Sequence, residues 1–198
     1  MQGQKDVYPV SHSWCSEINI WLAGVVSYEV TGVELILAEQ FVRGIKVRTG
    51  IRFTPGDILI LCLSSSIRIG WWRYLRLIQW LKKRYEIKLI VLCPAHIYSL
   101  RLLSGDNVIW LNGELSRDSV SEFLCCALKV ENKRIIRNTG ERINEFWKYA
   151  LMCLQEKPSA EVRISLSKKA YRRRLSLLRR LNFSSIHSLR VFMSGIKT

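Results

Sequence analysis

The clearest chemical feature of the sequence is a run of basic side chains near its carboxyl end. Between residues 163 and 180 the chain has eight basic residues and no acidic one: Arg163, Lys168, Lys169, Arg172, Arg173, Arg174, Arg179 and Arg180. Like charges three or four residues apart on a helix repel each other, so a helix that faces only water usually mixes signs. The run therefore indicates a polyanionic partner, although a solvated face on a basic protein has the same composition.

The charge of the whole chain points in the same direction. The 198 residues include 31 Lys and Arg against 16 Asp and Glu, a formal net charge of +15. Residues 131–198 hold 16 basic and 5 acidic residues, whereas residues 1–130 hold 15 and 11. The excess is thus concentrated in the last third of the chain. Nucleic acid, an acidic membrane surface or an acidic protein would each supply the missing charge.

Signatures of an enzyme are missing from the sequence. It has no G-x-G-x-x-G fingerprint and no P-loop. Its six cysteines form no C-x-x-C pair and no zinc-ligand spacing with the three histidines. His12 and Cys15 are near enough in sequence to form a nucleophile pair, but this is the weaker hypothesis. We expect a non-enzymatic protein with reduced cysteines, no cofactor, no metal and no small-molecule substrate.

The apolar stretches are too short for a membrane protein. The longest span about ten residues, roughly half of what a helix needs to cross a bilayer. The first residues, MQGQKDVYPVSHS, lack the basic end and apolar run of a signal peptide. These patterns predict a soluble cytoplasmic protein without a membrane partner.

Alternating strands and helices are predicted for the first two thirds of the chain. Continuous apolar runs predict buried strands at 57–66, 88–93 and 107–111, and helical spacing predicts helices at 71–85, 97–103 and 116–130. This alternation is typical of a doubly wound parallel α/β sheet, here residues 1–130. Nearer the amino terminus we expect a strand at 7–10, a helix at 14–26, and either a helix at 34–43 or a strand at 34–38.

An all-α domain is predicted for the rest of the chain. Residues 131–140 are polar and form the expected linker to a helical domain at 141–198. Within that domain, apolar spacing predicts helices at 144–155, 167–181 and 186–193. Several short helices with one strongly basic member are typical of a helix-turn-helix arrangement.

The sequence LSKKAYRRRLSLLRRLNFSSIHSLRVFM (166–193) resembles the end of the LuxR/FixJ-type DNA-binding domain. That family has a K-T-V motif, where this chain has Lys168, Lys169 and Ala170, and then an L-L-x-K-L core, matched by Leu177, Leu178, Arg180 and Leu181. A Ser-rich turn at 183–185 and Leu189 complete the likeness. The match covers about 50 residues and is loose at 161–167, where the family has its scaffold helix.

The resemblance implies a recognition helix that lies in the ~12 Å wide major groove of duplex DNA. The DNA-binding residues it implies are Lys168, Lys169, Tyr171, Arg172, Arg173, Arg174, Arg179 and Arg180. Arginine binds the edge of guanine through two hydrogen bonds, whereas the other cations suit phosphate. Ala170, Leu177, Leu178 and Leu181 are expected to face inward. Binding of an acidic protein by the same helix is the alternative.

An α/β module before a helix-turn-helix resembles the receiver domain of a response regulator, but the residues for its chemistry are missing. A receiver holds Mg²⁺ with carboxylates and phosphorylates an aspartate at the end of its third strand. Here that acceptor position falls on Cys62, the hydroxyl switch position on Cys93, the acidic pair near Ser13 and the lysine near Asn112. We therefore expect a degenerate receiver that is not phosphorylated.

The segment CSEINIWLAG (15–24) resembles a helix of the Rcs-type capsule and fimbrial regulators of enteric bacteria. Those proteins join a degenerate receiver to a LuxR-type domain. The likeness implies a bacterial transcription regulator that binds promoter DNA as a homodimer, or as a heterodimer with another LuxR-type regulator. The alternative is an auxiliary or anti-activator subunit that acts on another regulator through Trp-rich surfaces, among them Trp72.

Overall fold

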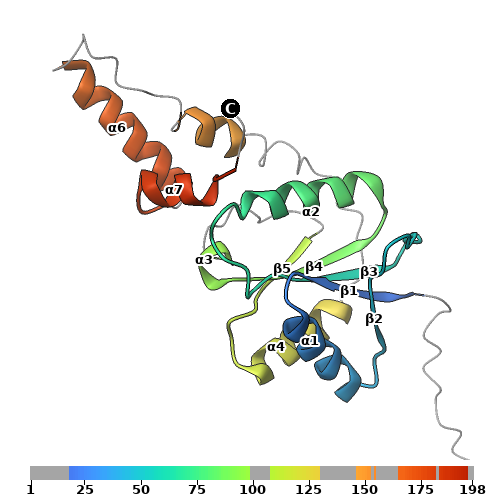
Figure 1. Cartoon of the computed structure of the whole chain (residues 1–198). Coiled ribbons are helices and arrows are strands. Elements are labelled where there is room, and N and C mark those ends of the chain that lie inside the picture. The colour runs from blue at the N-terminus through green and yellow to red at the C-terminus, as the bar shows by residue number, and fades with distance from the viewer. Residues whose placement is uncertain are drawn as a thin grey trace, which may run out of the picture.

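A five-stranded parallel sheet forms the centre of the protein (Figure 1). The computed structural model describes residues 18–98, 108–129, 146–152, 154, 165–181 and 183–195. The strands follow the spatial order β2-β1-β3-β4-β5, and every neighbouring pair is parallel. Their bounds are Ile20–Gly24 for β1, Gly44–Lys46 for β2, Ile58–Cys62 for β3, Lys88–Cys93 for β4 and Val108–Asn112 for β5.

The two central strands, β3 and β4, are buried along their whole length. Strands covered on both faces read as continuous apolar runs, which is why the sequence predicts them well. Alternate side chains point to opposite faces of the sheet. Leu59 and Leu61 thus join one hydrophobic cluster, whereas Ile58, Ile60 and Cys62 join the other.

Helices cover both faces of the sheet. Helices α1 (Ser27–Glu39) and α4 (Arg117–Lys129) lie on one face, and α2 (Trp72–Arg84) and the short α3 (Ala95–Tyr98) lie on the other (Figure 1). The strand order and this helix arrangement confirm the predicted doubly wound α/β fold and are compatible with a receiver-like topology. Residues 47–57, between β2 and β3, contain no helix.

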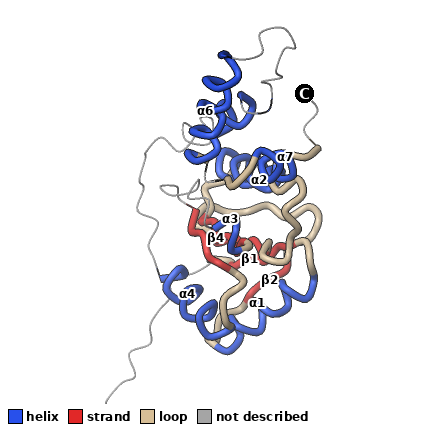
Figure 2. The backbone as a smooth tube through the Cα atoms, turned by 90° about the vertical axis from the view of Figure 1, so that its left-hand side faces the viewer, coloured by secondary structure: helices blue, strands red, loops and turns tan. Residues whose placement is uncertain are grey.

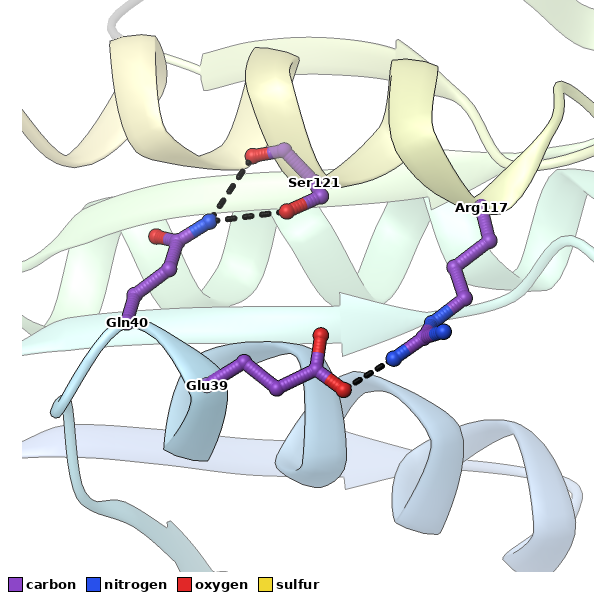
Figure 3. A network of polar contacts seen from close by, with 4 residues as sticks. All are labelled: Glu39, Gln40, Arg117 and Ser121. Atoms are coloured by element: carbon purple, nitrogen blue, oxygen red, sulfur yellow. Dashed lines mark hydrogen bonds and ion pairs between the residues drawn. The ribbon is translucent and has the colours of Figure 1, made fainter.

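Polar contacts join the carboxyl end of α1 to the first half of α4 (Figure 3). The side-chain nitrogen of Gln40 donates to the backbone and side-chain oxygens of Ser121, at 3.1 and 2.9 Å. Arg117 forms an ion pair with Glu39. These contacts fix the spacing of the two helices on this face.

The carboxyl-terminal helices pack on the opposite face, against α2. They comprise a helical segment at 146–152, α6 (Ser165–Arg180) and α7 (Ile186–Phe192), which begins at the N-cap Ser185. Figure 2 shows α7 beside α2, with α6 farther from the sheet. Apolar side chains of α6 and α7 belong to the same buried cluster as those of α2.

Two tryptophans at the start of α2 hold α7 in place. Trp71 stacks on Phe192, and the indole nitrogen of Trp72 donates to the carbonyl of Ser194 at 2.7 Å. The amide of Gly70 also donates to the carbonyl of Val191 at 3.0 Å. Both indoles are buried, so the hypothesis that Trp72 offers a surface to a partner is wrong.

Of the predictions for the first fifty residues, the helix at 14–26 was wrong and the helix at 34–43 was partly confirmed. The helix predicted at 14–26, and with it the helix implied by the Rcs-type likeness, is replaced over its last half by strand β1. Residues 34–39 belong to α1, which confirms that part of the helix predicted at 34–43 and makes the alternative of a strand at 34–38 wrong. The strand predicted at 7–10 lies outside the described residues, as do Ser13, His12, Cys15 and the linker at 131–140.

Farther along the chain the predicted elements are confirmed with small shifts. Strands β3 to β5 and helices α2, α4, α6 and α7 all lie within two residues of the predicted bounds or inside them. The helix predicted at 97–103 instead begins at Ala95. In the described part of the chain, every helix is too short or too polar to cross a lipid bilayer.

Candidate functional site

The carboxyl ends of the strands form the edge of the sheet where a binding site is expected. In doubly wound sheets ligands bind at this edge, where neighbouring connections leave in opposite directions. Here that point lies between β1 and β3, which pair with Gly24 opposite Cys62. Cys93 and Asn112 are paired at the ends of β4 and β5.

Both cysteines at this edge are buried. Cys62 and Cys93 have no exposed surface. Burial, followed by the charge of Glu29, raises the pKa of Cys62 to about 12. Burial, followed by the charge of Glu114, raises the pKa of Cys93 to about 12. Because a thiol reacts as the thiolate, both groups behave as apolar side chains near neutral pH.

At the carboxyl end of β3, an acidic side chain from α1 binds the loop that follows the strand. Glu29, in the first turn of α1, accepts hydrogen bonds from the amides of Ser64 and Ser65 at 2.8 and 3.1 Å. It also accepts one from the hydroxyl of Ser64. The carboxylate thereby fixes the loop that follows β3, and three of its hydrogen bonds are used within the chain.

Close packing continues toward β5. A Cβ atom on Gly113 would lie 2.3 Å from the hydroxyl oxygen of Ser64, a separation that no two such atoms tolerate. Only glycine fits this position. The loops after β3 and β5 therefore meet over the end of β4, beside a groove of about 570 Å³ that Glu29, Ser64 and Gly113 help to line.

The described residues place no acidic side chain directly after β1 or at the end of β3. The residues directly after β1 are Val25 and Val26, and the acid nearest the start of β3, Asp57, lies at the opposite edge of the sheet. Among the described residues there is no group of three or more His, Cys, Asp or Glu side chains with the geometry to hold a metal ion. This arrangement does not assemble a phosphoryl-transfer site from the described side chains.

Thiol reactivity tests this description of the edge. We expect iodoacetamide at about pH 8 to alkylate the exposed Cys126 at least ~100-fold faster than Cys62 or Cys93, because the two buried thiols are neutral and shielded. Mass spectrometry of tryptic peptides measures the rates. In urea the three cysteines should react alike. Alkylation of Cys62 in the folded protein as fast as that of Cys126 would contradict the prediction.

The second candidate site is the basic helix α6. Its apolar side was predicted correctly: Leu177, Leu178 and Leu181 are buried. The side chain of Ala170 lies outside the described part, as do those of Lys168 and Lys169, although all three residues are within α6.

The remaining side chains predicted to bind DNA differ in their exposure and in their contacts within the chain. Tyr171, Arg172, Arg173 and Arg179 are exposed. Arg174 is half-buried. Arg180 is exposed but lies over the ring of Tyr149, 5.4 Å from its centre, and donates to its hydroxyl at 3.4 Å. Arg180 therefore also helps to hold the 146–152 segment against α6.

Within the described part of the chain, no acidic side chain pairs with the exposed cations of α6. The two ion pairs between described residues, Lys46 with Glu34 and Arg117 with Glu39, are both in the α/β part. Arg172, Arg173 and Arg179 form no ion pair with any described carboxylate. Three cations on one helix face are thus available to an external anion.

Comparisons with known proteins found no relative of this chain. No protein-family model, no curated protein and no solved structure matches this chain. The LuxR-type and receiver resemblances consequently remain predictions from the sequence.

Sequence reasoning missed two features of these sites. Glu29 was not considered because the start of α1 was not predicted, although an acid in the first turn of a helix is a recognisable signal. The second missed feature is the basic surface of α2. The sequence pattern was used only to predict the helix, and the surface that its basic side chains form was not considered. Its five basic residues without an acid were already visible in the sequence.

Proposed function

We propose that this chain is a non-enzymatic transcriptional regulator that binds duplex DNA through the exposed face of α6. The observation that carries the proposal is the acid-free basic surface of that helix. Seven of its 16 residues are Lys or Arg. Of these, Arg172, Arg173 and Arg179 are exposed and form no ion pair with a carboxylate of the described residues.

The dimensions of α6 suit the proposal. A helix of 16 residues is about 24 Å long, and the major groove of B-DNA accepts a helix lengthwise. Arg172 and Arg173, near the middle, would read guanine edges or bind phosphate, while Arg179 would reach the backbone. The buried leucines of the opposite face anchor the helix to the rest of the protein, so that it presents a fixed surface.

The α/β part would bring two subunits together and would not be phosphorylated. With a buried cysteine at the acceptor position and Glu29 engaged by the loop after β3, its action would be independent of phosphorylation. We further propose that the regulator acts as a dimer on promoter DNA in the bacterial cytoplasm, with a second copy or another LuxR-type regulator as its partner.

Binding of the purified full chain to a duplex of about 30 base pairs tests the proposal. Fluorescence anisotropy at several salt concentrations should show saturable binding, with log K falling against log salt at a slope of roughly −3 or steeper, because each neutralised phosphate contributes about −0.9. Selection of binding sequences from a random pool should then return half-sites spaced about one helical turn apart. No saturable binding at about 50 mM salt would refute the proposal.

An auxiliary subunit that binds another regulator is the second candidate function. It is favoured by the apolar side chains that α1 exposes, since Tyr28 and Leu35 are 69% and 59% exposed. These side chains border a groove of about 570 Å³ between α1 and α4. Size-exclusion chromatography separates the two functions. A chain that binds no duplex but co-elutes with a second regulator would support the auxiliary role.

A further inference from the structure

Helix α2 carries a second basic surface, on the side that faces away from the sheet. Its exposed residues follow the helical repeat: Arg73, Arg76, Leu77, Trp80, Lys83 and Arg84. The helix contains five basic residues and no acidic one. Leu75, Ile78 and Leu81 on its opposite side are buried, and Trp72 at its start is buried under α7.

Helix stability explains only part of this charge. Cations in the last turn, such as Lys83 and Arg84, interact favourably with the negative end of the helix dipole. Arg73 lies in the first turn, where a cation is unfavourable, and it is three residues from Arg76, where like charges repel. Arg73 donates to the carbonyl of Gly70 at 3.2 Å, just before the helix, so Arg76 is the basic residue of the first half that helix stability does not account for.

Two of these side chains are oriented for contact with a ligand. The guanidinium of Arg76 lies over the ring of Trp72, 5.4 Å from its centre, which supports the group while its edge remains exposed. A guanidinium edge carries several N–H donors in a geometry that fits phosphate. Trp80 is 52% exposed between the cations and offers an apolar face of the kind that packs against a sugar.

This surface lies on the same side of the sheet as the proposed DNA-binding helix. Helix α7 is bound to the start of α2 through Trp71, Trp72 and Gly70. The buried leucines of α6 belong to the same cluster as the buried side of α2. Figures 1 and 2 both show α2, α7 and α6 on one side of the sheet, with α1 and α4 on the other.

We propose that the exposed face of α2 binds the phosphate backbone of the duplex that α6 contacts, beside the α6 site. The inference rests on the proposed function and adds to it a second, sequence-independent contact in the α/β part. A helix of 13 residues is about 20 Å long, which corresponds to about six phosphates of one strand along the duplex axis. Arg76, Lys83 and Arg84 supply the charge, and Trp80 packs against deoxyribose.

The salt dependence of duplex binding tests this contact. We compare the full-length wild type, the variant Arg76→Ala with Lys83→Ala, and a control, Arg43→Ala with Arg48→Ala, whose exposed arginines flank the edge strand β2. Loss of two phosphate contacts should make the slope of log K against log salt shallower by about 2 and weaken binding about tenfold or more near 0.1 M salt. The control should retain the wild-type slope.

The outcomes separate this inference from the proposed function. If the wild type binds duplex DNA and the α2 variant matches the control, the α2 contact is refuted and the α6 proposal stands. If the wild type binds no duplex, both are refuted. A further variant, Trp80→Ala, should weaken duplex binding with no change in slope, because tryptophan carries no charge. Stronger binding to single-stranded than to duplex DNA that depends on Trp80 would overturn the assignment of a duplex partner.

Discussion

Replacing Arg172 and Arg173 together by alanine is expected to weaken duplex DNA binding about 100-fold or more while the fold remains intact. Both side chains are exposed on α6 and form no ion pair with a described carboxylate. A well-placed arginine contact with a base contributes about 1–3 kcal/mol, so the loss of two such contacts accounts for an effect of this size.

The fold should tolerate this double substitution. Alanine has the highest helix propensity of all residues, and removing two neighbouring like charges relieves repulsion within α6. Circular dichroism and the thermal midpoint of the variant should therefore match those of the wild type. A loss of DNA binding then reports on the contact and not on unfolding.

The control is the Arg43→Ala, Arg48→Ala variant, which removes the same charge beside β2. Its affinity for duplex DNA should stay within about threefold of the wild type at moderate salt. Equal losses in the two variants would mean that net charge alone governs binding. Unchanged affinity of the α6 variant would remove the basis of the proposed function.

The second large effect is expected at Asp57, at the amino edge of the sheet. This carboxylate is fully buried just before β3. One oxygen accepts from the backbone and side-chain nitrogens of Asn19, at 3.2 and 3.4 Å. The other accepts from the indole of Trp21 at 2.8 Å and from the amide of Thr54 at 2.9 Å. One side chain thus joins β1, β3 and the loop that precedes β3.

We expect Asp57→Asn to lower the free energy of unfolding by about 3 kcal/mol at neutral pH. The amide group that replaces one oxygen is a donor, so at least one pair of buried donors would lose its acceptor. Leaving buried donors unsatisfied costs about 1–3 kcal/mol each. Urea denaturation followed by tryptophan fluorescence measures the difference.

The effect of Asp57 should also depend on pH. Burial by itself raises the pKa of this carboxyl, but the hydrogen bonds from Thr54, Trp21 and Asn19 outweigh burial and hold the pKa below its usual value. A lowered pKa in the folded state contributes stability above the unfolded pKa, near 3.9, and that contribution is lost as the pH falls through the folded pKa. The difference between wild type and Asp57→Asn should therefore shrink below about pH 4.

Asp118→Asn is the matched control for this prediction. Asp118 is exposed in the first turn of α4, where a carboxylate interacts only with the helix dipole. Its replacement should cost less than about 1 kcal/mol. If Asp57→Asn is no more destabilising than Asp118→Asn, the network at the amino edge does not stabilise the fold as described.

Tertiary pairing decided the structure of residues 18–50. The apolar run that contains β1 is short, and a short apolar run is compatible with a helix or a strand. Its pairing with β2 on one side and β3 on the other makes it a strand. The first half of helix α1 was equally hard to predict, because the helix exposes Tyr28 and Leu35 and so lacks a clear polar side.

The candidate sites also have some features that the sequence predicted and others that only tertiary contacts decided. The spacing of Leu177, Leu178 and Leu181 was enough to predict the buried side of α6, because a helix repeats every 3.6 residues. The lengths of β3 and β4 were enough to place Cys62 and Cys93 at one edge. The contacts of Glu29 with Ser64 and Ser65 join residues about 35 apart in the chain, and no local pattern reports on such contacts.

The sequence alone determined the order of β3, α2, β4, β5 and α4, the burial of the central strands and the concentration of positive charge on α6, since each follows from local periodicity or composition. Only the tertiary structure decided which strand stands between β2 and β3, and that Trp71 and Trp72 are buried under α7. It also placed the basic faces of α2 and α6 on one side of the sheet. The physical reason is that these features depend on contacts between distant segments, whose energies are absent from any short window of sequence.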